Sequence, residues 1–182
     1  MDLKTPIAAL VLVTAVAVPV ALFEPTDLDS LRIEAESGNC EALFRYGVCL
    51  IEGDGVDRDE RQAIALWTEA GMRGHAPAAA ALAGMYRARG RDPESIEEAR
   101  YWALRAADLG HAGAMIMLSG DALERGDLVE AAVWTRLADL GGRRWGDQVA
   151  TIESRLDGEA RREVDRRCGD WMASHRAVTM VE

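Results

Sequence analysis

The stretch GHAPAAAAL at residues 74–82 and the stretch GHAGAMIML at residues 110–118 start with the same three residues, 36 positions apart. A further 36 positions upstream, residues 38–46 read GNCEALFRY. The residues that recur in phase are Gly38, Gly74 and Gly110, then Ala42, Ala78 and Ala114, then Tyr46, Leu82 and Leu118. Steps of four residues place side chains in one row along a helix. The sequence therefore predicts three copies of a unit that begins with a helix.

A second helix in each unit is predicted by apolar residues spaced three and four positions apart. These residues are Ala63, Leu66 and Ala70, then Ala99, Trp102 and Ala106, then Ala131, Trp134 and Ala138. Units of two helices cannot bury their apolar faces alone, so they stack. We therefore expect an all-α fold, an α-solenoid of antiparallel helix pairs, with units at about residues 38–73, 74–109 and 110–142. A glycine in the left-handed conformation is expected where the units close, at Gly74, Gly110 and Gly142.

The segments on either side of the repeats are predicted to close the array. Residues 28–37 are typical of an entering helix. Together with this helix, the repeat domain is expected to span residues 24–142. Residues 143–175 are expected to form a final pair of capping helices, at 149–156 and 159–173, followed by a tail at 176–182. The second capping helix carries apolar residues at helical spacing amid charge, at Ala160, Val164, Cys168, Trp171 and Met172.

Several of these positions together resemble the Sel1-like repeat, a relative of the tetratricopeptide repeat. The resemblance is carried by Gly38-Asn39, Ala42, Tyr46-Gly47, the loop GDGVDRD at 53–59, and Ala99, Trp102, Ala106, Ala107 and Gly110. It extends over roughly residues 30–142. The chain departs from the pattern at Ala83 and Ser119, which replace a glycine, at Ala122, which replaces an aromatic residue, and at Trp67, one place past the expected tryptophan. The resemblance implies a right-handed superhelix and a noncatalytic adaptor or scaffold that binds other proteins.

In related repeat proteins the first helix of each unit lines the concave side, which implies a partner-binding surface on these helices. The candidate residues are Phe44, Val48, Ile51, Ala80, Gly84, Arg87, Ile116, Gly120 and Leu123. An exposed apolar groove of this kind suits a helix or an extended peptide. The alternative is that most of these residues simply fill the stack. If the groove is exposed, the acidic residues Glu52, Asp54 and Asp57 near it favour a basic partner.

The N-terminal segment is predicted to direct the protein to a membrane. Residues 7–23 carry no charge and follow Lys4. Residues 1–23 are therefore either a signal peptide, cleaved near Ala17 or Ala21, or an N-terminal membrane anchor that tethers the chain through residues 3–23. Pro19 would interrupt a helix late in the run, which favours the signal peptide. In both cases we expect an exported protein of a bacterial-type envelope, periplasmic or anchored to the inner membrane.

The residue types that catalysis and metal binding need are not gathered in a recognisable pattern. Lys4 is the only lysine, so the Ser-x-x-Lys and Lys-Thr-Gly motifs of penicillin-binding enzymes are absent. His75 and His111 share the repeat position of Asn39, where they are expected to serve the start of a helix rather than a metal. We therefore expect no catalytic residues, no metal and no cofactor.

The charge of the chain argues against nucleic acid as a partner. The net charge is −10, and residues 1–60 hold twelve acidic residues against four basic ones. A surface that binds phosphates needs the opposite balance. The expected partner is therefore a protein or a peptide. The alternative function is an accessory or weak enzyme of cell-wall or glycan metabolism that uses the groove as a substrate site.

Overall fold

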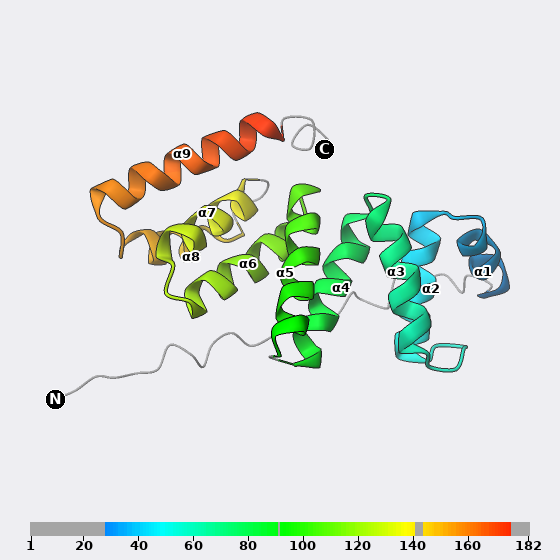
Figure 1. Ribbon diagram of the computed structural model, residues 1–182. Coiled ribbons are helices and arrows are strands. Elements are labelled where there is room, and N and C mark those ends of the chain that lie inside the picture. The colour runs from blue at the N-terminus through cyan, green and yellow to red at the C-terminus, as the bar shows by residue number, and fades with distance from the viewer. Residues whose placement is uncertain (1–27, 91, 141–143, 176–182) are drawn as a thin grey trace.

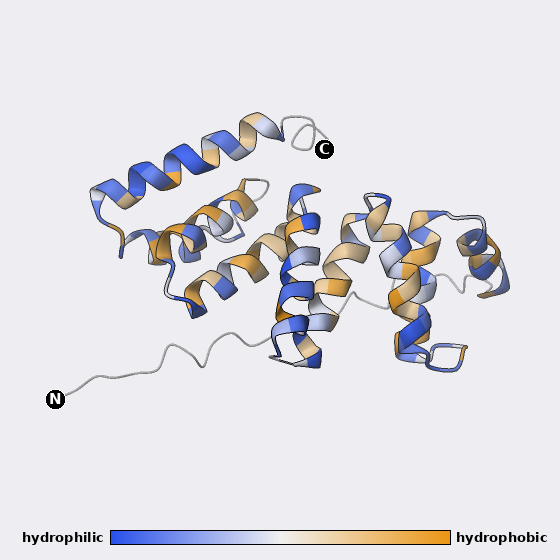
Figure 2. Cartoon of the chain, viewed as in Figure 1, coloured by the Kyte–Doolittle hydropathy of each residue, from blue (hydrophilic) through white to orange (hydrophobic). Residues whose placement is uncertain are grey.

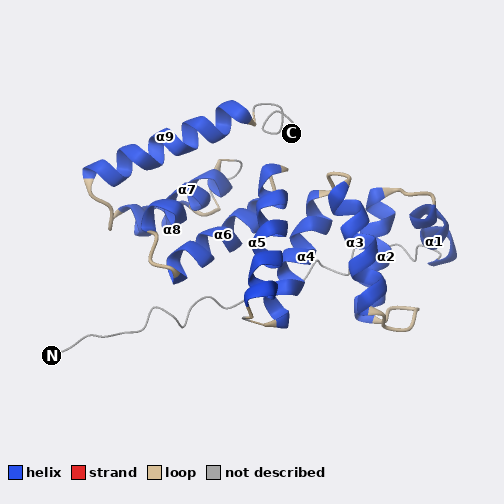
Figure 3. Cartoon of the chain, viewed as in Figure 1, coloured by secondary structure: helices blue, strands red, loops and turns tan. Residues whose placement is uncertain are grey.

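The computed structural model describes residues 28–90, 92–140 and 144–175, and within these ranges the chain folds into helices without a strand (Figures 1 and 3). The all-α prediction is confirmed. The helices are α1 (Leu28–Glu36), α2 (Cys40–Glu52), α3 (Glu60–Met72), α4 (Ala76–Arg89), α5 (Pro93–Asp108), α6 (Ala112–Glu124), α7 (Leu128–Asp139), α8 (Gly146–Glu153) and α9 (Gly158–Ser174).

The helices from α2 to α7 form three consecutive pairs, as the repeat predicts. The closest packing is within the pairs α2 with α3, α4 with α5, and α6 with α7. Neighbouring pairs meet where α3 packs on α4 and where α5 packs on α6. The pairs therefore follow one another in a row, with α1 packed on α2 at one end (Figure 1). The predicted entering helix corresponds in position to α1.

The first helix of each pair starts at the repeat position shared by Asn39, His75 and His111. Each side chain caps its helix by accepting a hydrogen bond from the backbone N–H three residues later. The two histidines do so through Nδ1, at 3.2 Å from the nitrogen of Ala78 and 3.1 Å from that of Ala114. An acceptor here satisfies one of the amides that a helix start leaves unpaired. The expectation that both histidines serve the helix start is confirmed.

The glycine between units adopts the left-handed conformation that the sequence predicts. The backbone angle φ is +94° at Gly74 and +82° at Gly110. A side chain is strained in this region, so glycine ends the helix there at little cost. Gly142, the third predicted position, lies outside the residues that the structure describes.

Small and large residues compensate one another where the two helices of a pair cross. Gly47 of α2 faces Trp67 of α3, and a Cβ atom on Gly47 would lie 2.3 Å from the indole Nε1. In the third pair, the hydroxyl groups of Ser119 and Thr135 lie 2.6 Å apart at the equivalent position. Two of the departures from the repeat pattern, Trp67 and Ser119, are thus matched by their neighbours. The buried seam of the first pair accordingly runs through Trp67, which is 5% exposed, while the predicted Leu66 is only half-buried.

The last two helices cap the array, but they do not form a pair like the others. Both α8 and α9 pack against α7. Arg136 of α7 joins them, because its guanidinium pairs with Glu153 of α8 at 2.5 Å and with Asp165 of α9. The buried side of α9 consists of Val164 and Cys168, and most of the rest of the helix is hydrophilic (Figure 2). Met172, predicted on the apolar side, is instead exposed.

Candidate partner-binding surface

The nine candidate residues occupy the same three positions on α2, α4 and α6, and we call them the first-helix strip. Their spacing of four and three residues places each trio on one face of its helix. The strip consists of Phe44, Val48, Ile51, Ala80, Gly84, Arg87, Ile116, Gly120 and Leu123. None of the nine is fully buried; eight are half-buried, and Leu123 is 39% exposed. The strip therefore contributes to packing and also remains accessible.

On α2, the strip residue Phe44 is held by neighbours from two other elements. Its ring centroid lies 6.1 Å from that of Trp67 and 5.3 Å from that of His75. Its carbonyl oxygen accepts a hydrogen bond of 2.9 Å from Trp67 Nε1. His75 is fixed in turn, because its Nε2 lies 3.1 Å from a carboxylate oxygen of Glu41. Phe44 therefore belongs partly to the fold.

On α4 and α6, the strip contains two glycines whose lack of a side chain is not required by internal packing. A Cβ atom on Gly84 would meet nothing within 4 Å, and one on Gly120 would meet only Arg87 Nη2, at 3.8 Å. By contrast, Gly71 of α3 leaves room for Trp102, whose ring would lie 3.0 Å from an added Cβ atom. Gly84 and Gly120 thus expose helix backbone in the middle of the strip.

Arg87 connects α4 to α6 at the far end of the strip. Its guanidinium lies 2.9 Å from a carboxylate oxygen of Asp121 and 3.6 Å from one of Glu124, and it also donates to the carbonyl oxygen of Met117. Burial raises the pKa of Asp121 above its usual range, and the positive charge of Arg87 opposes that rise. Arg87 is thus neutralised within the protein.

The sequence alone did not identify Asp121, Glu124 or Glu41 as neighbours of the strip. Arg87 and Asp121 are 34 positions apart, as are Glu41 and His75. That separation is close to one repeat length, so each pair joins equivalent regions of adjacent units. Opposite charges separated by about one repeat are the signal that could have revealed these contacts.

Exposed acidic side chains lie at the turns that follow the first helices of two successive pairs. Three of them are the acidic residues that the sequence analysis relates to the strip: Glu52, the last residue of α2, and Asp54 and Asp57 in the turn to α3, all exposed. The next pair adds the exposed residues Glu94 and Glu97 at the start of α5. The strip therefore ends at a negatively charged edge in two successive units.

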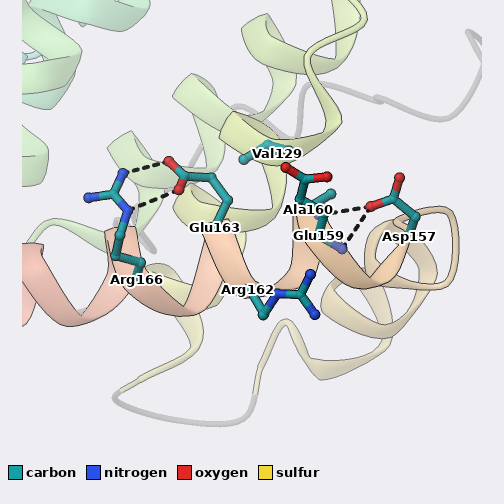
Figure 4. A pocket seen from close by; sticks show the side chains of 7 residues that line it. All are labelled: Val129, Asp157, Glu159, Ala160, Arg162, Glu163 and Arg166. Carbon is teal, nitrogen blue, oxygen red and sulfur yellow. Dashed lines mark hydrogen bonds and ion pairs between the residues drawn. The ribbon is translucent and has the colours of Figure 1, made fainter.

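A shallow recess lies elsewhere, between the start of α7 and α9 (Figure 4). Its charged groups are occupied by local structure. Asp157 caps α9 by accepting hydrogen bonds from the amides of Glu159 and Ala160, and Arg166 pairs with Glu163 at 2.6 Å. These contacts hold α9, and the recess shows no convergent set of groups that would orient a ligand.

Histidine, cysteine and acidic side chains are scattered over the part of the chain that the structure describes. No group of histidine, cysteine and acidic side chains there is placed to hold a metal ion. No helix there combines the length and apolarity that a membrane span needs. Cys40, Cys49 and Cys168 are free thiols, and burial raises the pKa of Cys49 and of Cys168. The predicted signal peptide or anchor at residues 1–23 lies outside the described residues.

Comparison with known proteins reveals similarity to one repeat family. The Sel1 repeat model matches residues 40–75 and 76–111. The crystal structure of a Sel1 repeat protein from Oxalobacter formigenes is similar, with a TM-score of 0.59 and 28% identity, over 69% of this chain and 98% of that chain. The crystal structure of c5321, a protective antigen in uropathogenic Escherichia coli strains that displays an SLR fold, has a TM-score of 0.49 and 20% identity, over 81% of this chain and 41% of that chain. No curated protein matches the chain.

Proposed function

The chain contains Sel1 repeats, and from this premise we propose that it is a noncatalytic adaptor that holds a partner peptide or helix on the first-helix strip. The Sel1-repeat fold generally serves as a scaffold for protein–protein interactions. The partner-binding role of these nine residues is the finer part of the proposal. It is supported by their partial exposure on three successive first helices.

The observation that carries the proposal is the pair of open glycines, Gly84 and Gly120. A glycine inside a helix costs about 1 kcal/mol relative to alanine. Internal packing explains that cost at Gly47 and Gly71, where a tryptophan occupies the space, but it does not explain it at Gly84. A partner that approaches the backbone of α4 closely would use the missing side chain. The strip is therefore suited to a segment packed directly against α4 and α6.

The test is a bulky substitution at Gly84 that leaves the fold intact. A Cβ atom at Gly84 would meet nothing within 4 Å and leucine is a good helix former, so we expect Gly84→Leu to fold at least as stably as the wild type. The leucine would occupy the volume that a partner needs. Chemical crosslinking in cells, followed by affinity purification and mass spectrometry, should recover a specific protein with the wild type and lose it with Gly84→Leu.

The matched control is Gly169→Leu. Gly169 is also inside a helix, α9, and also has nothing within 4 Å of an added Cβ atom, but it lies outside the strip. This variant should recover the same protein as the wild type. Identical recovery with Gly84→Leu would remove the strip from consideration. Phe44→Glu and Arg87→Glu are poorer tests, because both wild-type residues make contacts within the fold.

We further propose that the adaptor works in the cell envelope. The support is the uncharged run at residues 7–23, which follows Lys4 and fits a signal peptide or a membrane anchor. Fractionation of expressing cells should place the protein in the periplasm as a shortened species, or in the inner membrane at full length. Full-length protein confined to the cytosol would contradict the envelope assignment and would leave the proposed binding surface untouched.

A further inference from the structure

We propose that the partner segment is basic and amphipathic, with apolar side chains against the first-helix strip and lysine or arginine side chains against an acidic edge beside it. This proposal rests on the proposed function and specifies its partner. The acidic edge consists of Glu52, Asp54, Asp57, Glu94, Glu97 and Glu124. All six side chains are exposed.

The acidic edge follows one long side of the array. The turns from α2 to α3, from α4 to α5 and from α6 to α7 all lie on this side (Figure 1). The strip reaches the same side, because Ile51 and Leu123 are its last residues on α2 and α6 and each directly precedes a glutamate of the edge. A bound segment that covers the strip therefore reaches the carboxylates as well.

Several arginines on this side make contacts within the protein. Arg89 pairs with Glu60 at 2.7 Å, Arg125 pairs with Glu130 at 2.7 Å, and Arg58 donates to the carbonyl oxygen of Ile51. Arg87 is held by Asp121 and Glu124. Among the described residues, no arginine pairs with Asp54, Asp57, Glu94 or Glu97. These carboxylates produce a negative potential that a positively charged partner complements.

The opposite side of the array has a different electrostatic character. There the turns between units carry arginines that bind backbone carbonyl groups. Arg73 donates to the carbonyl oxygen of Gly38 at 2.9 Å, and Arg105 donates to those of Gly71 and Met72. Arg73 also pairs with Glu69 at 2.8 Å, whereas no ion pair of Arg105 occurs among the described residues. Unpaired carboxylates among the described residues thus mark the acidic edge, whereas Glu69 on the opposite side is paired with Arg73, and this difference orients a bound segment with its basic residues toward the acidic edge.

The test selects ligands from random sequences, so the partner does not have to be identified first. Random 16-residue peptides displayed on phage are selected against the purified full chain, and binders to Gly84→Leu are removed first. The charges of the surviving peptides are then read by sequencing. We expect enrichment of lysine and arginine together with leucine, isoleucine and phenylalanine at helical or alternating spacing.

The strongest peptide is then synthesised and its affinity is measured by fluorescence anisotropy. One quadruple variant removes four charges of the acidic edge: Asp54→Asn, Asp57→Asn, Glu94→Gln and Glu97→Gln. This variant should bind the peptide about tenfold more weakly at low salt. Raising the ionic strength should weaken binding to the wild type more than binding to the variant. The control variant changes four exposed carboxylates away from the edge, Glu34→Gln with Glu36→Gln, Asp147→Asn and Glu159→Gln. It has the same net charge and should retain wild-type affinity.

The outcomes separate the partner's charge from the location of the site. Selected peptides that are neutral or acidic, yet depend on Gly84, would overturn the basic partner and leave the strip as the binding surface. Equal weakening by the two quadruple variants would also overturn it, because the acidic edge would then have no local effect. Absence of any peptide that distinguishes the wild type from Gly84→Leu would overturn this proposal together with the proposed function.

Discussion

At the scale of single residues, the crossing of α2 and α3 depends on one absent side chain. Gly47 allows the indole of Trp67 to lie against the backbone of α2, where Nε1 reaches the carbonyl oxygen of Phe44. The sequence identifies Gly47 as a small position of the repeat and Trp67 as a displaced tryptophan. It does not show that one compensates for the other, because the two residues are 20 positions apart and meet only in the folded pair.

We expect Gly47→Ala to lower the free energy of unfolding by about 1–3 kcal/mol, because the new methyl group overlaps the indole and forces a shift in a packed core. Gly84→Ala is the matched control. It adds the same methyl group inside a helix where the space is open, so it should raise the free energy of unfolding by up to about 1 kcal/mol. Urea titrations followed by circular dichroism give both values. A stabilising Gly47→Ala would show that Trp67 is not held where the structure places it.

His111 predicts a dependence of stability on pH. Burial lowers the pKa of His111, so the folded state binds a proton less readily than the unfolded state does. The stability that neutral His111 contributes is present above the unfolded pKa of about 6.5 and is lost as the pH falls below it toward the lower folded pKa. Protonation also removes the Nδ1 acceptor that caps α6.

The variant His111→Asn isolates this effect, because asparagine does not titrate and already caps the equivalent helix at Asn39. The urea midpoint of the wild type should fall more between pH 7.5 and pH 5.5 than that of His111→Asn. Parallel curves for the two proteins would assign the acid sensitivity to other groups.

At the scale of helices, the sequence predicts α1 to α7 closely, because the residues that start and end each helix lie next to it in the sequence. Asn39, His75 and His111 start the first helices, while Asp59, Asp92 and Asp127 start the second ones. The arrangement of α8 and α9 could not be predicted in the same way. Periodicity identifies an apolar face but does not choose its neighbour, and α9 packs on α7 instead of forming a regular pair with α8.

The docking of α9 depends on its short buried face, so we expect Val164→Asp to release it. Val164 is fully buried, and an unpaired carboxylate in that position is strongly unfavourable. Release would expose the chain next to Arg161, Arg162, Arg166 and Arg167 to trypsin. Limited proteolysis should therefore cut Val164→Asp in α9 at least about tenfold faster than the wild type.

Ala173→Asp serves as the control for this experiment, since Ala173 is on the same helix and is exposed. It should be cut at the wild-type rate. Equal rates for Val164→Asp and Ala173→Asp would indicate that the ion pairs of Arg136 hold α9 without its apolar face.

At the scale of the whole molecule, contacts are made mainly between neighbouring helices, so stability should vary along the array. In such arrays each unit is stabilised by the units on either side of it. The helices α4 and α5 have neighbours on both sides, whereas α1 packs mainly on α2 among the described helices and buries Leu31 and Ala35. We expect amide hydrogens of α1 to exchange at least about 100-fold faster than those of α4 and α5. Hydrogen exchange with mass spectrometry resolves these segments, and uniform protection would mean that the array unfolds as one unit.

The sequence could predict which helix faces carry the nine candidate residues, but it could not predict the charges around them. The repeat register placed all nine residues on equivalent faces of α2, α4 and α6, and all nine remain at least partly accessible. The register could not show that Arg87 is neutralised by Asp121, because that ion pair joins two units and depends on how they stack. Nor could it show which glycines face open space, because nothing in the sequence distinguishes Gly84, which faces open space, from Gly47, which faces Trp67.

The matched crossings of the helix pairs also limit how such a chain can be rearranged. Gly47 fits the indole of Trp67 by shape, and Ser119 fits Thr135 by a hydrogen bond. In each case the residue on one helix suits only the residue that faces it on the other helix of the same pair. Moving α3 into the third pair would place an indole opposite Ser119, and moving α7 into the first would leave an unfilled hole above Gly47. Recombination or grafting must therefore exchange whole pairs, so the hairpin, rather than the single helix, is the smallest interchangeable part of this protein.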